Sequence, residues 1–378
     1  MNGLHVRGPL ARLGIVALVL LFIGPTSQPV AHGAAAGSAP ADAYLYFPVD
    51  GGRAVARWNG AAAGYTVAAA RDLLPGQFDG VGGGVFVYRP GSALDGILRV
   101  RLVDGELQLS FRKEVVNGEF EPVAGDFDGN GLTDIFWNRP DGGKSYIWLF
   151  NPDGSHVSRL FDDGYTGTWR PARGVDVNLD GVSDLVWTDE AGELWVMRRD
   201  GSHIRRNIAL FSYGGVSGFV AGNVGPADGV TRRRMVTIYE GGYEELLTFN
   251  SAGQSTSKVL RPHTGNCCKY QGAISGHFRS GYERTLFFYD GVFPQHTEYL
   301  QDVTPGGNSL ITAAPQITTS YDTAVGDYDG NGFDDVLLSD RGGRTFLFSS
   351  DGTTFTKSDP PNIPVHSFVV TVPMKSPG

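Results

Sequence analysis

The sequence predicts an all-β protein: a seven-bladed β-propeller of about 50-residue, four-stranded repeats, closed by its C-terminal strand. Three observations lead to this prediction. Apolar runs recur about every 50 residues, each run is short and bounded by turn residues, and one apolar strand at the C-terminus has no repeat of its own. A fixed period over most of a chain is typical of repeat architectures, and a four-stranded sheet repeated radially is a propeller blade.

The N-terminal residues 1–36 are predicted to be a signal peptide. Arg7 and Arg12 give a basic start, and the apolar run Leu13–Gly24 follows. This run is too short to cross a bilayer comfortably, so a membrane anchor is the weaker interpretation. Small residues come next, and we expect cleavage between Gly33 and Ala36. The mature protein is therefore expected to be secreted, with a short linker at 37–42, one propeller domain at 43–372 and a C-terminal tail at 373–378.

Composition narrows the classes of function. The chain has 378 residues, 54 Gly, 21 Pro and a formal net charge of -9. An acidic chain is a poor candidate for non-specific nucleic-acid binding. Its two cysteines are adjacent, Cys267 and Cys268. They are either two loop thiols or a strained vicinal disulfide, and two ligands are too few for a zinc site. The fold must therefore stand without a disulfide framework.

The repeat is read from the first apolar residue after each turn-rich loop. The first two of these anchors are 41 residues apart, and the later ones follow at 50 or 51. The anchors are Tyr44, Val85, Ile135, Leu185, Met235, Leu286 and Val336. They define seven units, which we number along the chain.

Each unit contains short runs rich in aromatic and β-branched residues. In the third unit, "EPVAG", "DIFWN", "SYIWLFN" and "HVSRLF" are separated by segments such as "RPDGGK" and "PDGS". Gly, Asp and Pro between such runs are typical of hairpin turns. The first unit lacks a run equivalent to "EPVAG". The orphan strand Ser367–Val372, "SFVVTV", is predicted to supply it and to hide two sheet edges.

Three units carry an acidic loop before the anchor, as in "GDFDGNGLTD". Oxygen side chains stand at positions 1, 3, 5 and 9, glycine stands at position 6, and the carbonyl of position 7 is expected to point inward. Such alternating oxygens wrap a hard cation that takes six or more oxygen ligands. The alternative is a set of Asx-rich turns without metal. The predicted ligands are Asp126, Asp128, Asn130, Leu132 and Asp134; Asp176, Asn178, Asp180, Val182 and Asp184; and Asp327, Asp329, Asn331, Phe333 and Asp335.

These loops resemble the FG-GAP (VCBS-type) repeats of the integrin α-subunit propeller, which also occur in secreted bacterial proteins. The resemblance implies calcium, about three ions per chain, bound on one face of the propeller. Four units depart from the motif. The second keeps only Asp79, the fifth and sixth have Arg234 and Thr285 at the last position, and the first has no loop. We expect no metal in these four.

Sequence motifs of common enzymes, such as GxSxG or HExxH, are not found. We therefore predict a calcium-stabilised, non-catalytic binding or adhesion-type module for an extracellular glycan or protein. The alternative is a carbohydrate-active enzyme, a polysaccharide lyase or a glycosidase. Clustered carboxylates of raised pKa in a central cleft would favour the enzyme, and an aromatic rim would favour binding. His156 and His203 recur after "DGS" and are predicted to be structural.

The ligand is expected on the face opposite the acidic loops. Connections there carry aromatic and basic side chains, which are common binding anchors. The candidate ligand-binding residues are Trp169, Tyr165, Arg139, Lys144, Arg341 and Arg344. Four tryptophans that recur within strands are predicted to be core instead: Trp137, Trp148, Trp187 and Trp195.

Overall fold

The structure is a computed structural model. It describes residues 41–91, 94–140, 143–161, 171–187, 193–207, 216–221, 225–226, 234–239, 244–261, 272–289, 299–304, 306–307, 309–313, 322–340, 343–360 and 367–374. All statements below concern these residues. No helix among them is long and apolar enough to cross a membrane.

The described strands form antiparallel sheets that follow the predicted units. The first unit contains β29 (Ser367–Pro373), β1 (Asp42–Pro48), β2 (Gly52–Trp58) and β3 (Ala61–Val67). The second contains β4 (Asp72–Gly76), β5 (Gly84–Tyr88), β6 (Gly96–Val103) and β7 (Glu106–Lys113). The third contains β8 (Glu121–Gly125), β9 (Asp134–Asn138), β10 (Ser145–Phe150) and β11 (His156–Phe161).

The same order continues around the molecule. The fourth unit contains β12 (Pro171–Val175), β13 (Asp184–Trp187), β14 (Glu193–Met197) and β15 (His203–Asn207). The fifth contains β16 (Val216–Ala221), β18 (Arg234–Tyr239), β19 (Glu244–Phe249) and β20 (Ser255–Arg261). The seventh contains β25 (Asp322–Gly326), β26 (Asp335–Ser339), β27 (Thr345–Ser350) and β28 (Phe355–Ser358).

The prediction of seven four-stranded blades is wrong. The described residues form six regular four-stranded blades, and the sheet of the sixth unit departs from this pattern. It has five strands: β17 (Gly225–Pro226), β21 (Gly272–Gly276), β22 (Tyr282–Tyr289), β23 (Tyr299–Val303) and β24 (Ser309–Ala313). Both β17 and β21 pair with β22, along different parts of its length.

The sequence of the sixth unit explains this difference. In the third, fourth and seventh units, the second strand begins at the last acid of the loop: Asp134, Asp184 and Asp335. The sixth unit has Thr285 at that position. Its strand β22 begins three residues earlier, at Tyr282. Without the acidic loop, residues 282–284 are extended, and their backbone pairs with β17.

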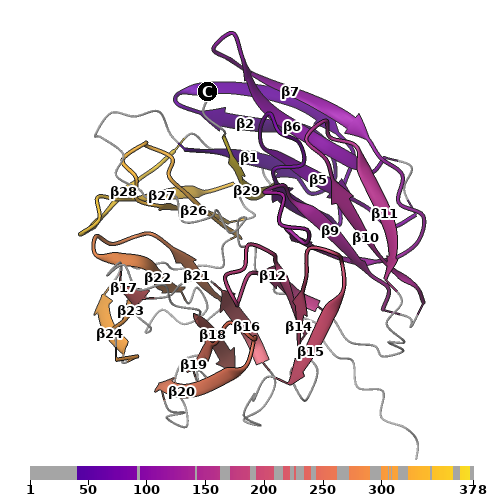
Figure 1. The fold of residues 1–378 in the computed structure, drawn as a ribbon. Coiled ribbons are helices and arrows are strands. Elements are labelled where there is room, and N and C mark those ends of the chain that lie inside the picture. Colours follow the sequence, from indigo (N-terminus) through magenta and orange to yellow (C-terminus); the bar gives the residue numbers. More distant parts are fainter. Residues whose placement is uncertain are drawn as a thin grey trace, which may run out of the picture.

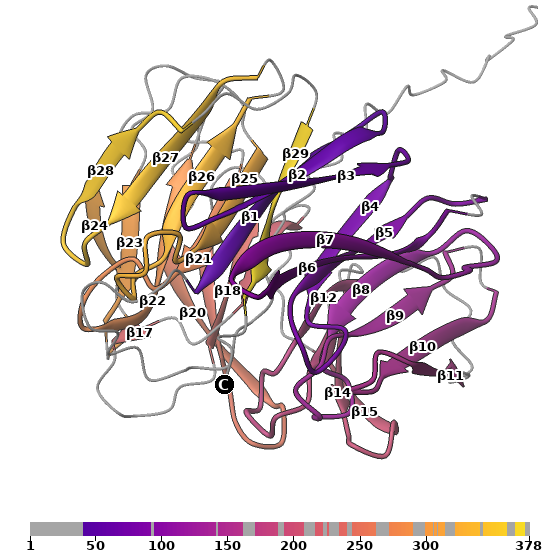
Figure 2. The ribbon, with the colours of Figure 1, turned by 90° about the horizontal axis from the view of Figure 1, so that it is seen from above.

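The fold is a β-propeller whose ring is closed by the C-terminal strand, and this part of the prediction is confirmed. Figure 1 shows the sheets following one another in chain order, so that the yellow strands return beside the indigo ones. Strand β29 pairs antiparallel with β1, from Asp42↔Pro373 to Pro48↔Ser367. It also lies beside β25 and β4, the inner strands of the neighbouring sheets. In Figure 2, β29 lies between β25 and β1. The two ends of the chain therefore share one blade.

The core lies between adjacent sheets. The second strands β5, β9, β13 and β26 are buried along their whole length, because the sheets on both sides cover them. This is why these segments read as continuous apolar runs rather than alternating ones. The four recurring tryptophans are buried, as predicted, with at most 8% of each residue exposed.

The two recurring histidines pack on these tryptophans. The ring of His156 stacks on Trp148 with centroids 4.0 Å apart, and His203 stacks on Trp195 at 4.7 Å. Phe161 of the third blade also stacks on Trp195, at 5.6 Å. The predicted structural role of the histidines therefore agrees with their packing, which helps to join the third blade to the fourth.

Candidate functional site

The acidic loop of the third blade connects β8 to β9. The carboxylate of Asp126 accepts hydrogen bonds from the N–H groups of Gly129, Asn130 and Gly131 at 2.7, 3.0 and 2.8 Å. Gly129 and Gly131 have φ angles of 71° and 84°. Glycine adopts this left-handed region without steric cost. The glycines thus turn the backbone so that its N–H groups surround the first carboxylate.

The last acid of this loop is buried and joins three segments. Asp134 is 0% exposed. Its carboxylate accepts the N–H of Phe127 within the loop and the N–H of Phe150 at the end of β10, both at 2.8 Å. Burial is the main cause that raises the pKa of Asp134 to about 8, and the charge of Asp128 adds to the rise. A nearby cation would favour the charged form.

The other two acidic loops repeat this geometry. Asp184 accepts the N–H groups of Val177 and Met197 at 3.1 and 2.8 Å, and Asp335 accepts those of Tyr328 and Ser350 at 3.0 and 2.9 Å. Burial raises the pKa of both carboxyl groups to about 8. The local sequence therefore fixes the same structure three times.

The donor set fits a hard cation. In the third blade, carboxylate oxygens of Asp126, Asp128 and Asp134 lie within 4.8 Å of one another. The same is true of Asp327, Asp329 and Asp335 in the seventh. Three carboxylates at this distance repel one another, and a divalent cation with oxygen preference would remove that repulsion. These groups are the residues that the sequence predicted at positions 1, 3 and 9.

The loop of the fourth blade differs in two details. Asn178 replaces the middle carboxylate, and its amide donates to Asp180 at 2.9 Å. Leu179 has a φ angle of 58° where the other loops have Gly129 and Gly330. The metal roles of all three loops, including those of the carbonyl groups of Leu132, Val182 and Phe333, stay predictions.

Among the described residues, the loops also join neighbouring units at four junctions, which the sequence did not predict. In the third and fourth blades, the Ser183 hydroxyl accepts the N–H of Asp126 at 2.9 Å, and the Ser183 N–H donates to the Asp126 carbonyl at 2.6 Å. We call this reciprocal pair the inner clamp. It recurs among the described residues at Gln77 with Thr133, His277 with Asp334, and Asp327 with Asp42. The inner clamp thus couples position 1 of a loop to position 8 of the next unit.

A second contact joins the blades at their outer edge. In four units, a basic side chain on the outermost strand donates a hydrogen bond to a backbone carbonyl in a turn of the following unit. We call this the outer clamp. The pairs are Arg112 with Gly154, Arg159 with Asp200, Arg206 with Ala252, and Lys258 with Gly306.

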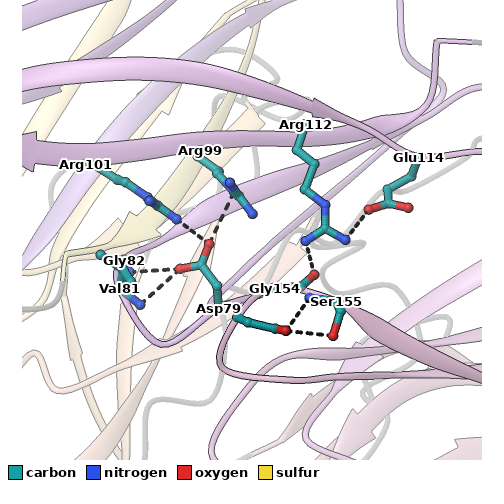
Figure 3. Close-up of polar contacts among 10 residues, drawn as sticks. Asp79, Val81, Gly82, Arg99, Arg101, Arg112, Glu114, Gly154 and Ser155 are labelled. Atoms are coloured by element: carbon teal, nitrogen blue, oxygen red, sulfur yellow. Dashed lines mark hydrogen bonds and ion pairs between the residues drawn. The ribbon is translucent and has the colours of Figure 1, made fainter.

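Two units without the acidic motif hold an ion pair where the others hold carboxylates. Asp79, at position 3 of the second unit, lies 3.2 Å from Nε of Arg99 (Figure 3). Arg279, at position 3 of the sixth unit, lies 2.7 Å from Asp302. Strand register places Arg99 and Asp302 at the same point of their sheets, one residue beyond the partner of the anchor. The two pairs therefore have the same position and opposite polarity.

The matching strand position is neutral in the three blades with an acidic loop. There it is Leu149, Val196 or Ser349. In the second and sixth units, a charged residue on the third strand thus accompanies the loss of the acidic motif, and an arginine pairs with the acid there. Comparing these positions between units would have revealed the pattern from sequence.

The predicted ligand-binding residues are only partly described. Arg139 lies over the ring of Phe120 at 5.9 Å, Lys144 is exposed, and Arg344 is 62% exposed and pairs with Asp340. All three lie in connections between second and third strands, at the end of the sheets away from the acidic loops. Tyr165, Trp169, Arg341 and the cysteine pair lie outside the described residues.

Comparisons with known proteins support the architecture. No family model and no curated protein matched the chain. An Agrocybe aegerita lectin, described as recognising non-reducing terminal N-acetylglucosamine, matches with a TM-score of 0.67 at 14% identity, over 87% of this chain and 94% of the lectin. The BP39L lectin of Burkholderia pseudomallei matches with a TM-score of 0.58 at 13% identity, over 86% and 96%.

A putative 6-phosphogluconolactonase from Bacteroides fragilis also matches, with a TM-score of 0.53 at 15% identity, over 88% of this chain and 97% of that one. At such identities the likeness concerns the fold alone. One propeller architecture serves both binding proteins and proteins described as enzymes, so the function must be argued from the residues of this chain.

Proposed function

We propose that this protein is an exported, calcium-stabilised β-propeller that binds an extracellular glycan without catalysing its conversion. The proposal rests on one observation: the buried acids of the loops form hydrogen bonds with the backbone of the propeller. Asp134, Asp184 and Asp335 are fully buried, and each binds two backbone N–H groups. They hold loops in place and cannot touch a substrate.

Calcium would act on the scaffold. When bound, it would supply a positive charge among Asp126, Asp128 and Asp134, and among the equivalent groups of the other loops. The inner clamp places the backbone of Asp126 against Ser183 of the next blade, and that of Asp327 against Asp42 of the first. An ordered loop would therefore stabilise two blades and keep binding surfaces between them rigid.

Glycan recognition is supported by the fold shared with two lectins. The enzyme alternative calls for carboxyl groups of raised pKa in a central cleft, whereas Asp134, Asp184 and Asp335 are buried within loops. A role as a binding module is therefore the better supported of the two predictions. We propose that the glycan contacts the face that carries Arg139, Lys144 and Arg344.

A glycan array probed with and without a chelator tests the proposal. We expect binding to a defined subset of glycans, and weaker binding after calcium is removed because the loops lose order. Release of modified or shortened sugars from the bound glycans would favour the enzyme instead. Binding to no glycan, by a protein that is folded and loaded with calcium, would refute glycan recognition.

A further inference from the structure

Three arginines lie together where the second blade meets the third. Arg99 and Arg101 are on β6 and Arg112 is on β7, and we call them the arginine cluster. Figure 3 shows their side chains directed toward Asp79 and the turn that carries Gly154. The three side chains are 21, 27 and 26% exposed. Solvent and solutes can therefore reach them.

Two carboxylates face the three guanidinium groups. Asp79 pairs with both Arg99 and Arg101, and its other oxygen accepts the N–H of Val81 at 3.0 Å. Glu114 lies 2.6 Å from Arg112. Within this group the positive charges exceed the negative ones by one.

Two further titratable groups lie beside the cluster. The carboxylate of Asp153 is exposed and accepts the N–H and hydroxyl of Ser155 at 2.8 and 2.6 Å. Nδ1 of His156 lies 3.8 Å from Glu114. Asp153 is oriented toward Ser155 and screened by solvent, so it compensates the charge of the guanidinium groups only weakly.

Equivalent positions in other units carry fewer arginines than the arginine cluster does. In the sixth unit, Arg279 alone pairs with Asp302, and strand register places Thr304 and Thr312 where the second unit has Arg101 and Arg112. In the third blade, Arg159 makes the outer clamp without arginines at the positions of Arg99 and Arg101, where Leu149 and Asn151 stand. Arg99 and Arg112 therefore have structural counterparts, and Arg101 is additional.

The arginine cluster surrounds Gly154 and has a spare donor on Arg101. Gly154 has a φ angle of 83°, and a Cβ atom added to it would lie 2.6 Å from Nη1 of Arg112 and 2.8 Å from Nη2 of Arg99. The Nε–H of Arg101 is buried and donates no hydrogen bond within the part of the protein that the structure describes, whereas Nε of Arg99 faces the Asp79 carboxylate at 3.2 Å. Burial, together with the charges of Arg101 and Arg112, lowers the pKa of Arg99.

We propose that the arginine cluster binds a small oxyanion: a carboxylate, sulfate or phosphate group. Guanidinium groups present their N–H donors in a planar fork that matches such oxygens, and these charge-assisted hydrogen bonds are stronger than neutral ones. The oxyanion comes either from a free inorganic ion or from an acidic group on a saccharide. The site lies at the acidic-loop end of the sheets and stands whether or not the protein binds a glycan at its other face.

Arg101→Gln tests the proposal, because it removes the additional guanidinium and leaves the Arg99–Asp79 pair and the outer clamp in place. Inorganic sulfate is titrated into the protein at constant ionic strength, and the Nε–H signals of the arginines are followed by NMR. We expect saturable shifts in the wild-type protein, and binding at least about tenfold weaker in the variant. Arg159→Gln is the matched control, because it removes an outer clamp with no extra arginines, and it should bind sulfate like the wild type.

Saccharides distinguish the two sources of the oxyanion. A galacturonate disaccharide and a sulfated disaccharide are each compared with their neutral counterparts. Tighter binding of an acidic sugar than of sulfate, lost in Arg101→Gln, would identify a saccharide ligand; equal affinities would identify a free ion. The proposal is wrong if sulfate and both acidic sugars fail to bind the folded wild-type protein, or if they bind Arg101→Gln as well as they bind the wild type.

Discussion

At the scale of single residues, the molecule keeps carboxylic acids where water is excluded. Asp134, Asp184 and Asp335 are each 0% exposed, and each satisfies N–H groups from two segments. Backbone hydrogen bonds favour the charged form, while burial disfavours it more strongly and raises the pKa to about 8. The protonation of these three groups should therefore be linked to folding and to cation binding.

The calcium-free protein is predicted to lose stability as the pH rises. An unfolded aspartic acid has a pKa of about 4, and the three buried groups have a folded pKa of about 8. Because the folded state holds these protons more tightly, its stabilisation is complete below about pH 4 and is lost as the pH passes through about 8. The melting temperature in chelator should therefore fall between pH 5 and pH 8.5.

Calcium provides the control for this prediction. A bound cation keeps the carboxylates charged, so the fall should be smaller in calcium, and calcium affinity should increase with pH as protons are released. A melting temperature in chelator that is constant or increases over this range would contradict the assignment of protonated acids to these loops.

At the scale of elements, two kinds of interaction hold the loops against the sheets: hydrogen bonds to buried acids, and ion pairs. Three blades use the acidic loop, and the second and sixth units use the pairs of Asp79 with Arg99 and Arg279 with Asp302. Asp302 is 0% exposed and also accepts the hydroxyl of Thr285 at 3.0 Å. A buried carboxylate of this kind depends on its partner, because an unpaired charge is costly to bury.

Arg279→Gln is predicted to destabilise the protein by about 3 kcal/mol, by analogy with buried pairs that lose one partner. The loss should be the same in calcium and in chelator, because no predicted metal ligand lies in this unit. Adding Asp302→Asn should restore part of the stability, since the uncompensated charge is then removed. Chemical denaturation of the single and double variants measures both effects, and a double variant less stable than the single one would contradict the explanation.

The closing strand is the other element on which the ring depends. Deleting residues 366–378 would remove β29, which pairs with β1 over its whole length. We expect an insoluble or strongly destabilised protein, because the edge of β1 is exposed and the contacts with β25 and β4 are lost. A chain that ends after Met374 keeps the strand and is the control. If the shorter chain melts like the full-length protein, β29 does not close the ring.

At the scale of the whole molecule, local features could be predicted from the sequence and distant ones could not. The acidic loops were predictable because their residues lie within nine positions of one another. The orphan strand was predictable because its apolar pattern had no partner nearby. The inner clamp of Asp42 with Asp327 joins residues 285 positions apart. The two-residue strand β17 has no pattern of its own. Both depend on how the ring closes in space.

The central claim is that calcium in the acidic loops stabilises the propeller. It rests on carboxylate groups that lie within 4.8 Å of one another in the third and seventh units, and on the repeated geometry of the fourth. The inner clamps of Asp126 and Asp327 would then transmit the order of these two loops to the next sheet. Removing one carboxylate, as in Asp128→Ala, should affect one site only.

Calorimetric titration of calcium into the chelator-treated, folded protein tests this claim most directly. We expect about three tight sites per chain, two in Asp128→Ala, and a melting temperature that increases with calcium concentration because the ion binds the folded state. A folded protein that takes up no calcium, or an Asp128→Ala variant with the same number of sites as the wild type, would contradict the claim.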